Sequence, residues 1–280
     1  MRILHGILIV WCLVFPSRVI GEYLDPGAVY VKTDSYENHT KLQLPLGAYK
    51  YDIAWQGISV ASGDVVVKQR LIEGQKFFRV EANAKTADVI DWVYKLRHHS
   101  ESLFEANSLK PLSFTTWQKE NSHHSIRKVR FLDSGHIESR RWKDGEEGTN
   151  QFFATNNLTL DPLSAAFLAR SLPIEVSSVH TFDVFNGKNR FLISFRVAGL
   201  ESLSLGNGTT VRAYRIVPSV EKLTDSSKRE PKLDSALIWL SADSHRDILK
   251  LESKVWVGSI IAQLIDFTPQ SESRTHEARM

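Results

Sequence analysis

Two adjacent histidine pairs, His98-His99 and His123-His124, are the first residues of this chain whose types suggest chemistry. Neighbouring residues on a β-strand point to opposite faces, so each pair can offer only one imidazole to a given site. His99 and Glu101 share a face, and a metal centre would need at least one further ligand to converge on them. We therefore predict no metal site and interpret these histidines as solvent-facing.

Motifs for nucleophilic catalysis or phosphate binding are missing from the sequence. It has no Gly-x-Ser-x-Gly elbow, and the segments 62–64 (SGD) and 134–136 (SGH) are typical of turns. The segment 206–208 (GNG) is not followed by Lys and Ser or Thr, so it does not match a phosphate loop. We predict no catalytic residues and no cofactor, and favour a protein that is not an enzyme.

Several charged side chains on neighbouring predicted strands form a second candidate site. If they point inward they would make a polar cavity suited to an anionic head group, and if they point outward they form a charged surface. Six tryptophans follow the leader described below, and they either line a cavity or fill the core. The candidate ligand-binding residues are Trp55, Arg97, His99, Glu101, Arg130 and Arg140.

Period-2 alternation of apolar and polar residues dominates the chain and must position these side chains. It is clearest in residues 76–82, 190–197 and 248–257 and indicates half-buried antiparallel strands. Gly- and Asn-rich turns recur between the runs, and Asn186-Gly187 is the best hairpin signal. We expect a mostly β fold of roughly a dozen strands, in one barrel-like or strongly curved antiparallel sheet.

One buried helix is expected at about residues 161–172. Asp161 is a good N-cap, Pro162 suits the first helical position, and Pro173 ends the segment. A short helical turn is also expected near residues 87–94, where Val89, Ile90, Trp92 and Val93 give a local apolar surface.

The first 21 residues are typical of a secretory signal, with Arg2 before a short apolar run and cleavage after Gly21. Cys12 is the only cysteine and lies in this leader, so the mature chain would have no thiol or disulfide. Residues 22–45 form a lead-in, residues 46–268 the β domain and residues 269–280 a disordered tail. No transmembrane segment is expected after signal cleavage.

Composition limits the class of protein. The 280 residues are 42% hydrophobic and 24% charged, which is typical of a globular chain. The net charge is +3, and removal of Arg2 and Arg18 with the leader leaves 33 basic and 32 acidic residues. A nearly neutral mature chain gives no electrostatic reason to expect nucleic acid as a partner.

Four segments in order carry a resemblance to the DUF3108 family of exported bacterial proteins of unknown function. The resemblance runs from Leu46 to Phe267, and the chain departs from the family in a polar insertion at 223–233 and a long C-terminal tail. It implies a periplasmic or cell-envelope location and a mostly β fold, with no catalytic residues to transfer. The segments are 51–58 (YDIAWQGI), 87–97 (ADVIDWVYKLR) with 101–102, 161–165 (DPLSA) with 172–173, and 236–243 (ALIWLSAD) with 251–254 and 258–260.

The predicted function is non-enzymatic binding of an apolar or amphipathic ligand, or of a partner protein, in the periplasm. Two alternatives remain open: a hydrolase that acts on envelope glycan or lipid, and a structural scaffold without ligand. The partner could be a lipid, a glycan or an envelope protein, and the oligomeric state is left open.

Overall fold

Strands make up most of the computed structural model, which describes residues 45–223, 236–255 and 258–270. The expected signal peptide, most of the lead-in, most of the polar insertion and nearly all of the tail lie outside these residues. In chain order the elements are β1 (Gly47–Trp55), β2 (Ile58–Ile72), β3 (Gln75–Thr86), β4 (Leu96–Glu105), β5 (Pro111–Glu120), β6 (His123–Phe131), β7 (His136–Lys143), β8 (Glu146–Glu147), β9 (Gln151–Ala154), β10 (Thr159–Leu160), α1 (Pro162–Ser171), β11 (Val179–Phe185), β12 (Arg190–Ser204), β13 (Thr210–Lys222), β14 (Ala236–Ser241), β15 (Ile248–Lys254) and β16 (Ser259–Pro269).

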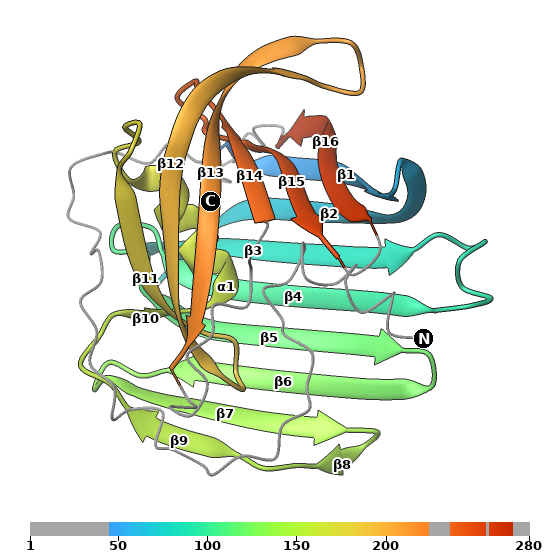
Figure 1. Cartoon of the computed structure of the whole chain (residues 1–280). Helices are drawn as coiled ribbons and strands as arrows, with labels where there is room; N and C mark the ends of the chain where they lie inside the picture. Colours follow the sequence, from blue (N-terminus) through green and yellow to red (C-terminus); the bar gives the residue numbers. More distant parts are fainter. Residues whose placement is uncertain (1–44, 224–235, 256–257, 271–280) are drawn as a thin grey trace, which may run out of the picture.

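All sixteen strands belong to one sheet. Its order is β10-β11-β12-β13-β14-β15-β16-β1-β2-β3-β4-β5-β6-β7-β8, and β9 pairs with β7. Neighbours are antiparallel except for the short parallel pair β10 and β11. Within the described chain β8 and β10 stay at opposite ends of this order, so the sheet curls strongly without closing (Figure 1). The expectation of a curved, mostly antiparallel sheet is confirmed.

Alternating burial shows how the sequence pattern gives each strand an inner face and an outer face. On β4 every second residue is buried, including Ser102 and Phe104. The Phe104 ring lies 5.5 Å from that of Phe167 on α1, which identifies this side as the inner face. Arg97, His99 and Glu101 therefore point to the opposite, outer side.

The hairpin expected at Asn186-Gly187 joins β11 to β12. Gly187 has φ +85°, a conformation that glycine adopts without a Cβ clash. The Asn186 side chain accepts hydrogen bonds from the backbone N–H groups of Lys188 and Asn189 (3.0 and 2.9 Å). Phe185 and Arg190 then pair across the two strands, so the local turn chemistry sets their register.

Helix α1 forms where the sequence predicts it and lies inside the curve of the sheet (Figure 1). The Asp161 carboxylate accepts hydrogen bonds from the N–H groups of Leu163 and Ser164, and Pro162 begins the first turn. The Ser102 hydroxyl of β4 donates to the other oxygen of the same carboxylate at 2.7 Å. The cap is thus also a tertiary contact, because it fixes the start of the helix against the inner face.

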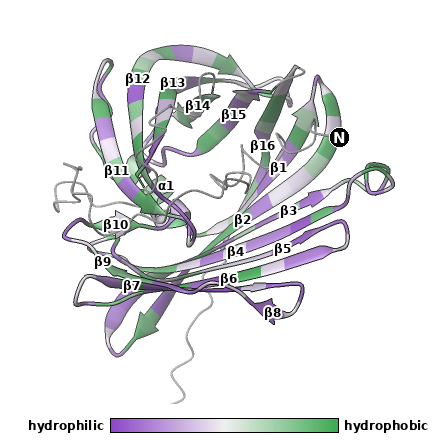
Figure 2. Cartoon of the chain, turned by 60° about the horizontal axis from the view of Figure 1, so that its bottom comes forward, coloured by the Kyte–Doolittle hydropathy of each residue, from purple (hydrophilic) through white to green (hydrophobic). Residues whose placement is uncertain are grey.

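The main hydrophobic core lies between α1 and the sheet. It gathers residues from both halves of the chain, among them Val80, Phe104, Leu168, Phe191 and Val197. Polar residues are frequent along β4–β7 in the hydropathy view (Figure 2). Within the described chain, no helix has the length and apolar character that a membrane span requires.

The segment expected to form a helical turn near residues 87–94 is a hydrogen-bonded turn between β3 and β4, with Asp91 N bonded to Ala87 O and Tyr94 N to Ile90 O. Ile90 packs against a small second core that includes Ile53 and Val60. Trp92 is 93% exposed, so this tryptophan belongs to the surface.

Candidate functional site

A cavity of about 210 Å³ lies between α1 and strands β11–β15. The helix contributes Pro162, Ala165, Ala166, Ala169 and Arg170 to its wall. Their spacing of three and four residues places them on one helical face. The alanine side chains on that face fill little of the gap between the helix and the strands, so the space follows from the sequence of α1.

The strand side of the cavity is mainly apolar. Glu252 and Ser253 add polar groups, and Glu252 forms an ion pair with Lys250 at 2.9 Å. An apolar wall with a few polar groups is typical of a site for a small molecule. The apolar residues on this side are Phe182, Ile193, Phe195, Ile216, Pro218, Ala236, Leu237, Ile238, Leu240, Ile248 and Leu251.

Arg170 is the charged residue that the helix brings to the cavity, and it is only 5% exposed. Its Nη2 donates to Asp247 Oδ1 at 2.7 Å and to the His245 carbonyl at 2.9 Å. Its Nε donates to the Arg246 carbonyl at 2.8 Å. The guanidinium also faces the rings of Tyr49 and Phe167, with 5.8 and 5.3 Å to their centroids. These contacts on several sides fix the position of the cation.

Arg246, in the turn between β14 and β15, hydrogen-bonds in the opposite direction, to the end of α1. Its Nη1 donates to the carbonyls of Arg170 and Leu172 at the end of α1. The Asp243 carboxylate shapes the turn by accepting hydrogen bonds from the N–H groups of His245 and Arg246. The two arginines thus join the helix C-terminus to the β14–β15 turn through reciprocal hydrogen bonds, which hold one end of the cavity in place.

Two tyrosines of β1 complete the polar group near Arg170. The Tyr49 hydroxyl donates to Asp247 Oδ1 at 3.0 Å, and the Tyr51 hydroxyl donates to the Ile248 carbonyl at 3.0 Å. Burial raises the pKa of Tyr49 to about 12 and also raises the pKa of Tyr51, so both are neutral donors at pH 7. Together with Arg170 and Ile248 they line a second cavity of about 70 Å³.

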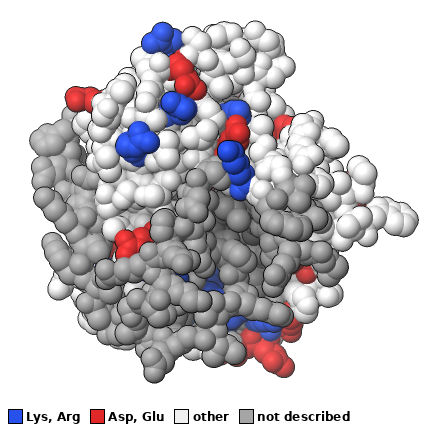
Figure 3. Space-filling model, viewed as in Figure 1, with Lys and Arg blue, Asp and Glu red and all other residues white. Residues whose placement is uncertain are grey.

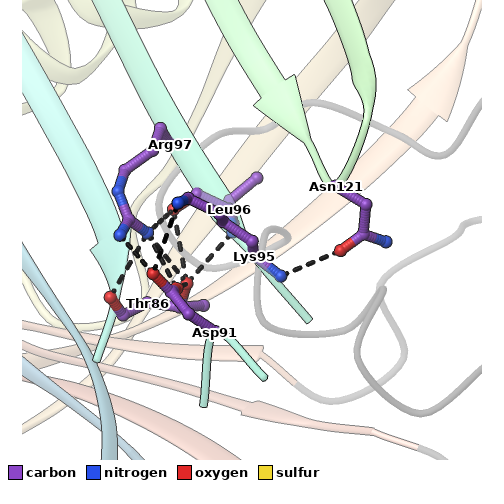
Figure 4. Close-up of polar contacts among 6 residues, drawn as sticks. All are labelled: Thr86, Asp91, Lys95, Leu96, Arg97 and Asn121. Atoms are coloured by element: carbon purple, nitrogen blue, oxygen red, sulfur yellow. Dashed lines mark hydrogen bonds and ion pairs between the residues drawn. The ribbon is translucent and has the colours of Figure 1, made fainter. Parts of the chain in front are cut away.

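Three of the candidate residues predicted from sequence, Arg97, His99 and Glu101, form a row on the outer face of β4. Arg97 forms an ion pair with Asp91, and Arg97 Nη1 donates to Thr86 Oγ1 at 3.1 Å (Figure 4). This pairing and the Thr86 hydrogen bond lower the pKa of Asp91 to about 2.

The other two residues of this row are matched to side chains of β3. His99 Nδ1 lies 2.7 Å from Asn83 Oδ1. Glu101 accepts a hydrogen bond of 2.7 Å from Arg79. Each of the three side chains therefore has a partner on the outer surface, away from the cavity wall.

The remaining candidates are dispersed. Trp55 ends β1 and packs against the second core, while Arg130 and Arg140 lie on the outer faces of β6 and β7. Arg130 is paired with Glu138 at 3.6 Å and is 69% exposed at the side chain. On the described part of the face in Figure 3, acidic and basic side chains alternate without forming one large patch. The binding role predicted for these six residues stays a prediction.

The described part of the chain has no cluster of metal-ligating side chains, and its tryptophans do not line the cavity. Within the described ranges no three His, Asp or Glu side chains come close enough to hold a metal ion. The described tryptophans are absent from the cavity wall. Trp239, for example, is buried on the far side of β14, where its Nε1 donates to Glu201 at 2.7 Å.

Sequence reasoning missed the cavity although a signal for it exists. The helix sequence places Ala165, Ala166 and Ala169 on one face and ends that face with Arg170. This helix is predicted to be buried, and it has alanines on one side and large apolar residues on the other. Such a helix leaves space beside the alanines. That asymmetry could have located the space, whereas the partner of Arg170, Asp247, is 77 residues away and has no local signal.

Comparison with known proteins agrees with the architecture. The family model "Protein of unknown function (DUF3108)" matches residues 50–265. A search of curated proteins gave no match. A crystal structure described as a beta-barrel-like protein of domain of unknown function DUF1849, from Brucella abortus, is similar with a TM-score of 0.51 and 10% identity, over 81% of this chain and 99% of that one. That likeness concerns the fold alone, whereas the family match spans most of the sequence: the chain belongs to the DUF3108 family.

Proposed function

We propose that this chain is an exported cell-envelope protein that binds a small apolar or amphipathic molecule in the cavity between α1 and β11–β15. The observation that carries the proposal is the apolar space along the alanine face of the helix. The space is partly open, so its apolar wall contacts water unless an occupant covers it. A space maintained by small side chains is therefore best explained by an occupant.

The size of the cavity narrows the ligand class. At about 210 Å³ it exceeds the apolar cavity of roughly 150 Å³ that accepts benzene, and it lies below the roughly 300 Å³ at which drug-sized pockets begin. One ring or one medium-length alkyl chain fits this range. The apolar wall favours a lipid-like molecule over a glycan, whose hydroxyls would need many polar partners.

The arrangement of the polar groups supports binding without catalysis. Glu252 is paired with Lys250, and the hydroxyl of Ser253 is directed to the carbonyl of Lys254 at 3.5 Å. Arg170 is held by Asp247 and two carbonyls. These paired polar groups can position a ligand. Catalysis by a nucleophile would instead need a base in hydrogen-bond contact with that nucleophile.

A cavity-filling substitution tests the binding site. Ala166→Leu places a larger side chain on the cavity face, and we expect it to lower affinity for 1-octanol at least tenfold in a calorimetric titration. Ala154→Leu makes the same change at an exposed position of β9 and should bind like wild type. Unchanged affinity in a folded Ala166→Leu protein, or no saturable binding by wild type, would refute the proposed site.

Export rests on the N-terminal sequence and has its own test. Protein recovered from the envelope fraction of the native host should begin at Glu22, as measured by intact mass. Native mass spectrometry of the same material should show an added mass that is lost in Ala166→Leu. Recovery of full-length protein from the cytosol would contradict export and leave the binding test unaffected.

A further inference from the structure

The two cavities beside α1 share part of their walls. Ala166 and Arg170 of the helix and Ile248 at the start of β15 border both the cavity of about 210 Å³ and the cavity of about 70 Å³. An alanine side chain is a single methyl group, so two spaces that both border Ala166 lie next to each other. The two cavities therefore adjoin near the C-terminal end of the helix.

The smaller cavity continues along the inner face of the sheet beyond β15. Its strand wall includes Tyr49 and Tyr51 of β1 and Val65 of β2, and all three residues pack in or against the main hydrophobic core. In the sheet order β1 and β2 follow β15 and β16, whereas the larger cavity lies against β11–β15. The combined space therefore follows the curve of the sheet around one side of α1.

The polar side chains that border the smaller cavity already have hydrogen-bond partners within the protein. The Tyr49 hydroxyl donates to Asp247, and the Tyr51 hydroxyl donates to the Ile248 carbonyl. Arg170 donates to Asp247 and to two carbonyls. An apolar group can enter this space without displacing a hydrogen bond, whereas a buried polar group would need partners of its own.

The polar groups of the larger cavity lie at its opposite end. Ile248 borders both cavities, whereas Glu252 and Ser253 border the larger one and follow four and five residues later on β15. A strand advances by about 3.3 Å per residue, which places these two residues roughly 13–17 Å from the junction. The space thus has a polar end and an apolar end, as an amphipathic chain has.

The size of the smaller cavity indicates which part of a ligand it can hold. A water molecule takes about 30 Å³ in the liquid, so a volume of about 70 Å³ has room for about two groups of that size, such as a methyl and a methylene. An apolar ring does not fit, because the cavity known to accept benzene measures roughly 150 Å³. A linear chain end fits this space.

We propose that the ligand is a linear amphipathic chain that occupies both cavities. Its polar end lies beside Glu252 and Ser253, and its methyl end lies in the smaller cavity beside Tyr51 and Val65. The smaller cavity then sets the chain length that the protein prefers. The inference rests on the proposed function and specifies the shape and length of the ligand.

A pair of alcohols that differ by two methylenes tests the use of the smaller cavity. Burial of one methylene raises affinity about fourfold, which corresponds to about 0.8 kcal/mol. We expect wild-type protein to bind 1-decanol at least tenfold more tightly than 1-octanol in a calorimetric titration. Any smaller gain would overturn the inference and leave the larger cavity as the binding site. If 1-octanol itself does not bind saturably, the proposed function fails and the inference fails with it.

A substitution on β2 shows where the two added carbons bind. Val65→Phe fills the smaller cavity, whereas Val66→Phe makes the same change at the next half-buried position, on the opposite face of the strand. The gain from 1-octanol to 1-decanol should fall below threefold in Val65→Phe and stay at least tenfold in Val66→Phe. Both variants should bind 1-octanol within about twofold of wild type.

A gain of threefold or more in folded Val65→Phe would overturn the inference, because the chain end would then lie outside the smaller cavity. Folding is checked by thermal melting. If Val65→Phe does not fold, the wild-type ratio of 1-decanol to 1-octanol affinity still decides the inference.

Discussion

Two buried arginine–aspartate pairs hold different parts of this protein together. Arg190 and Asp183 face each other across β11 and β12, and both side chains are 0% exposed. Arg170 and Asp247 join the helix to the β14–β15 turn and border two cavities. The pairs have the same chemistry and similar burial, so their differences come from what surrounds them.

The first pair is enclosed by its neighbours. Arg190 donates to both oxygens of Asp183 and to Thr155, and Asp183 also accepts from Asn157 and Thr159. The second pair borders two cavities, and Asp247 also accepts a hydrogen bond from the Tyr49 hydroxyl. Comparing them shows that one kind of ion pair can either be enclosed by polar neighbours or lie beside unfilled space.

Removal of Arg190, the cation of the enclosed pair, should have the largest effect on stability. Arg190→Met leaves Asp183 as a buried, unpaired anion, and we expect the free energy of unfolding to fall by about 3–5 kcal/mol in urea denaturation. Arg130→Met removes a long cationic side chain that is 69% exposed and should cost less than about 1 kcal/mol. Similar losses in the two variants would show that enclosure of the Arg190–Asp183 pair adds nothing to the cost of removing an exposed cation.

The interpretation of His98 as solvent-facing is wrong, because it lies on the inner face of β4 and is 4% exposed, and this burial gives the protein a pH dependence. Burial, with a smaller contribution from His99, lowers the pKa of His98 from 6.5 to about 4, so folded His98 stays neutral while the unfolded chain takes up a proton. Stability from this group is complete above pH 6.5 and is lost as the pH falls toward 4. We expect a loss of about 2 kcal/mol between pH 7 and pH 5, measured by urea denaturation.

Two histidine variants isolate that contribution. His98→Leu removes the titrating group and should flatten the stability profile between pH 7 and pH 5. His99→Gln changes the adjacent outer-face residue and should keep nearly the wild-type slope. An unaltered slope in His98→Leu would assign the pH dependence to other groups.

Single hydroxyl deletions compare the two pairs most directly. Thr159→Val removes one donor to Asp183, and Tyr49→Phe removes one donor to Asp247. We expect a loss of about 2 kcal/mol for the enclosed pair and about 1 kcal/mol for the pair beside the cavities, where a water molecule has room to replace the hydroxyl. The ranking of the two urea midpoints is the measurement, and a reversed order would contradict the distinction.

Much of the fold could be predicted because its signals are local. Alternation identified the strands around residues 76–82 and 190–197, Asn186-Gly187 identified a hairpin, and Asp161-Pro162 identified the start of α1. Each signal depends on backbone geometry within a few residues. Strand β12 continues to Ser204, beyond the predicted segment, because pairing with β13 supports it past the bulge near Gly199.

The sequence by itself determined a mostly β chain with one buried helix and its membership of a family, since periodicity and caps act over short distances. Only the tertiary structure decided which strand faces point inward and which arginine borders a cavity. Arg97 and Arg170 are both paired with an aspartate, yet one is on the outer face and the other is 5% exposed. The reason is that strand curvature and contacts such as Arg170–Asp247 depend on residues that are distant in the chain, which local patterns cannot encode.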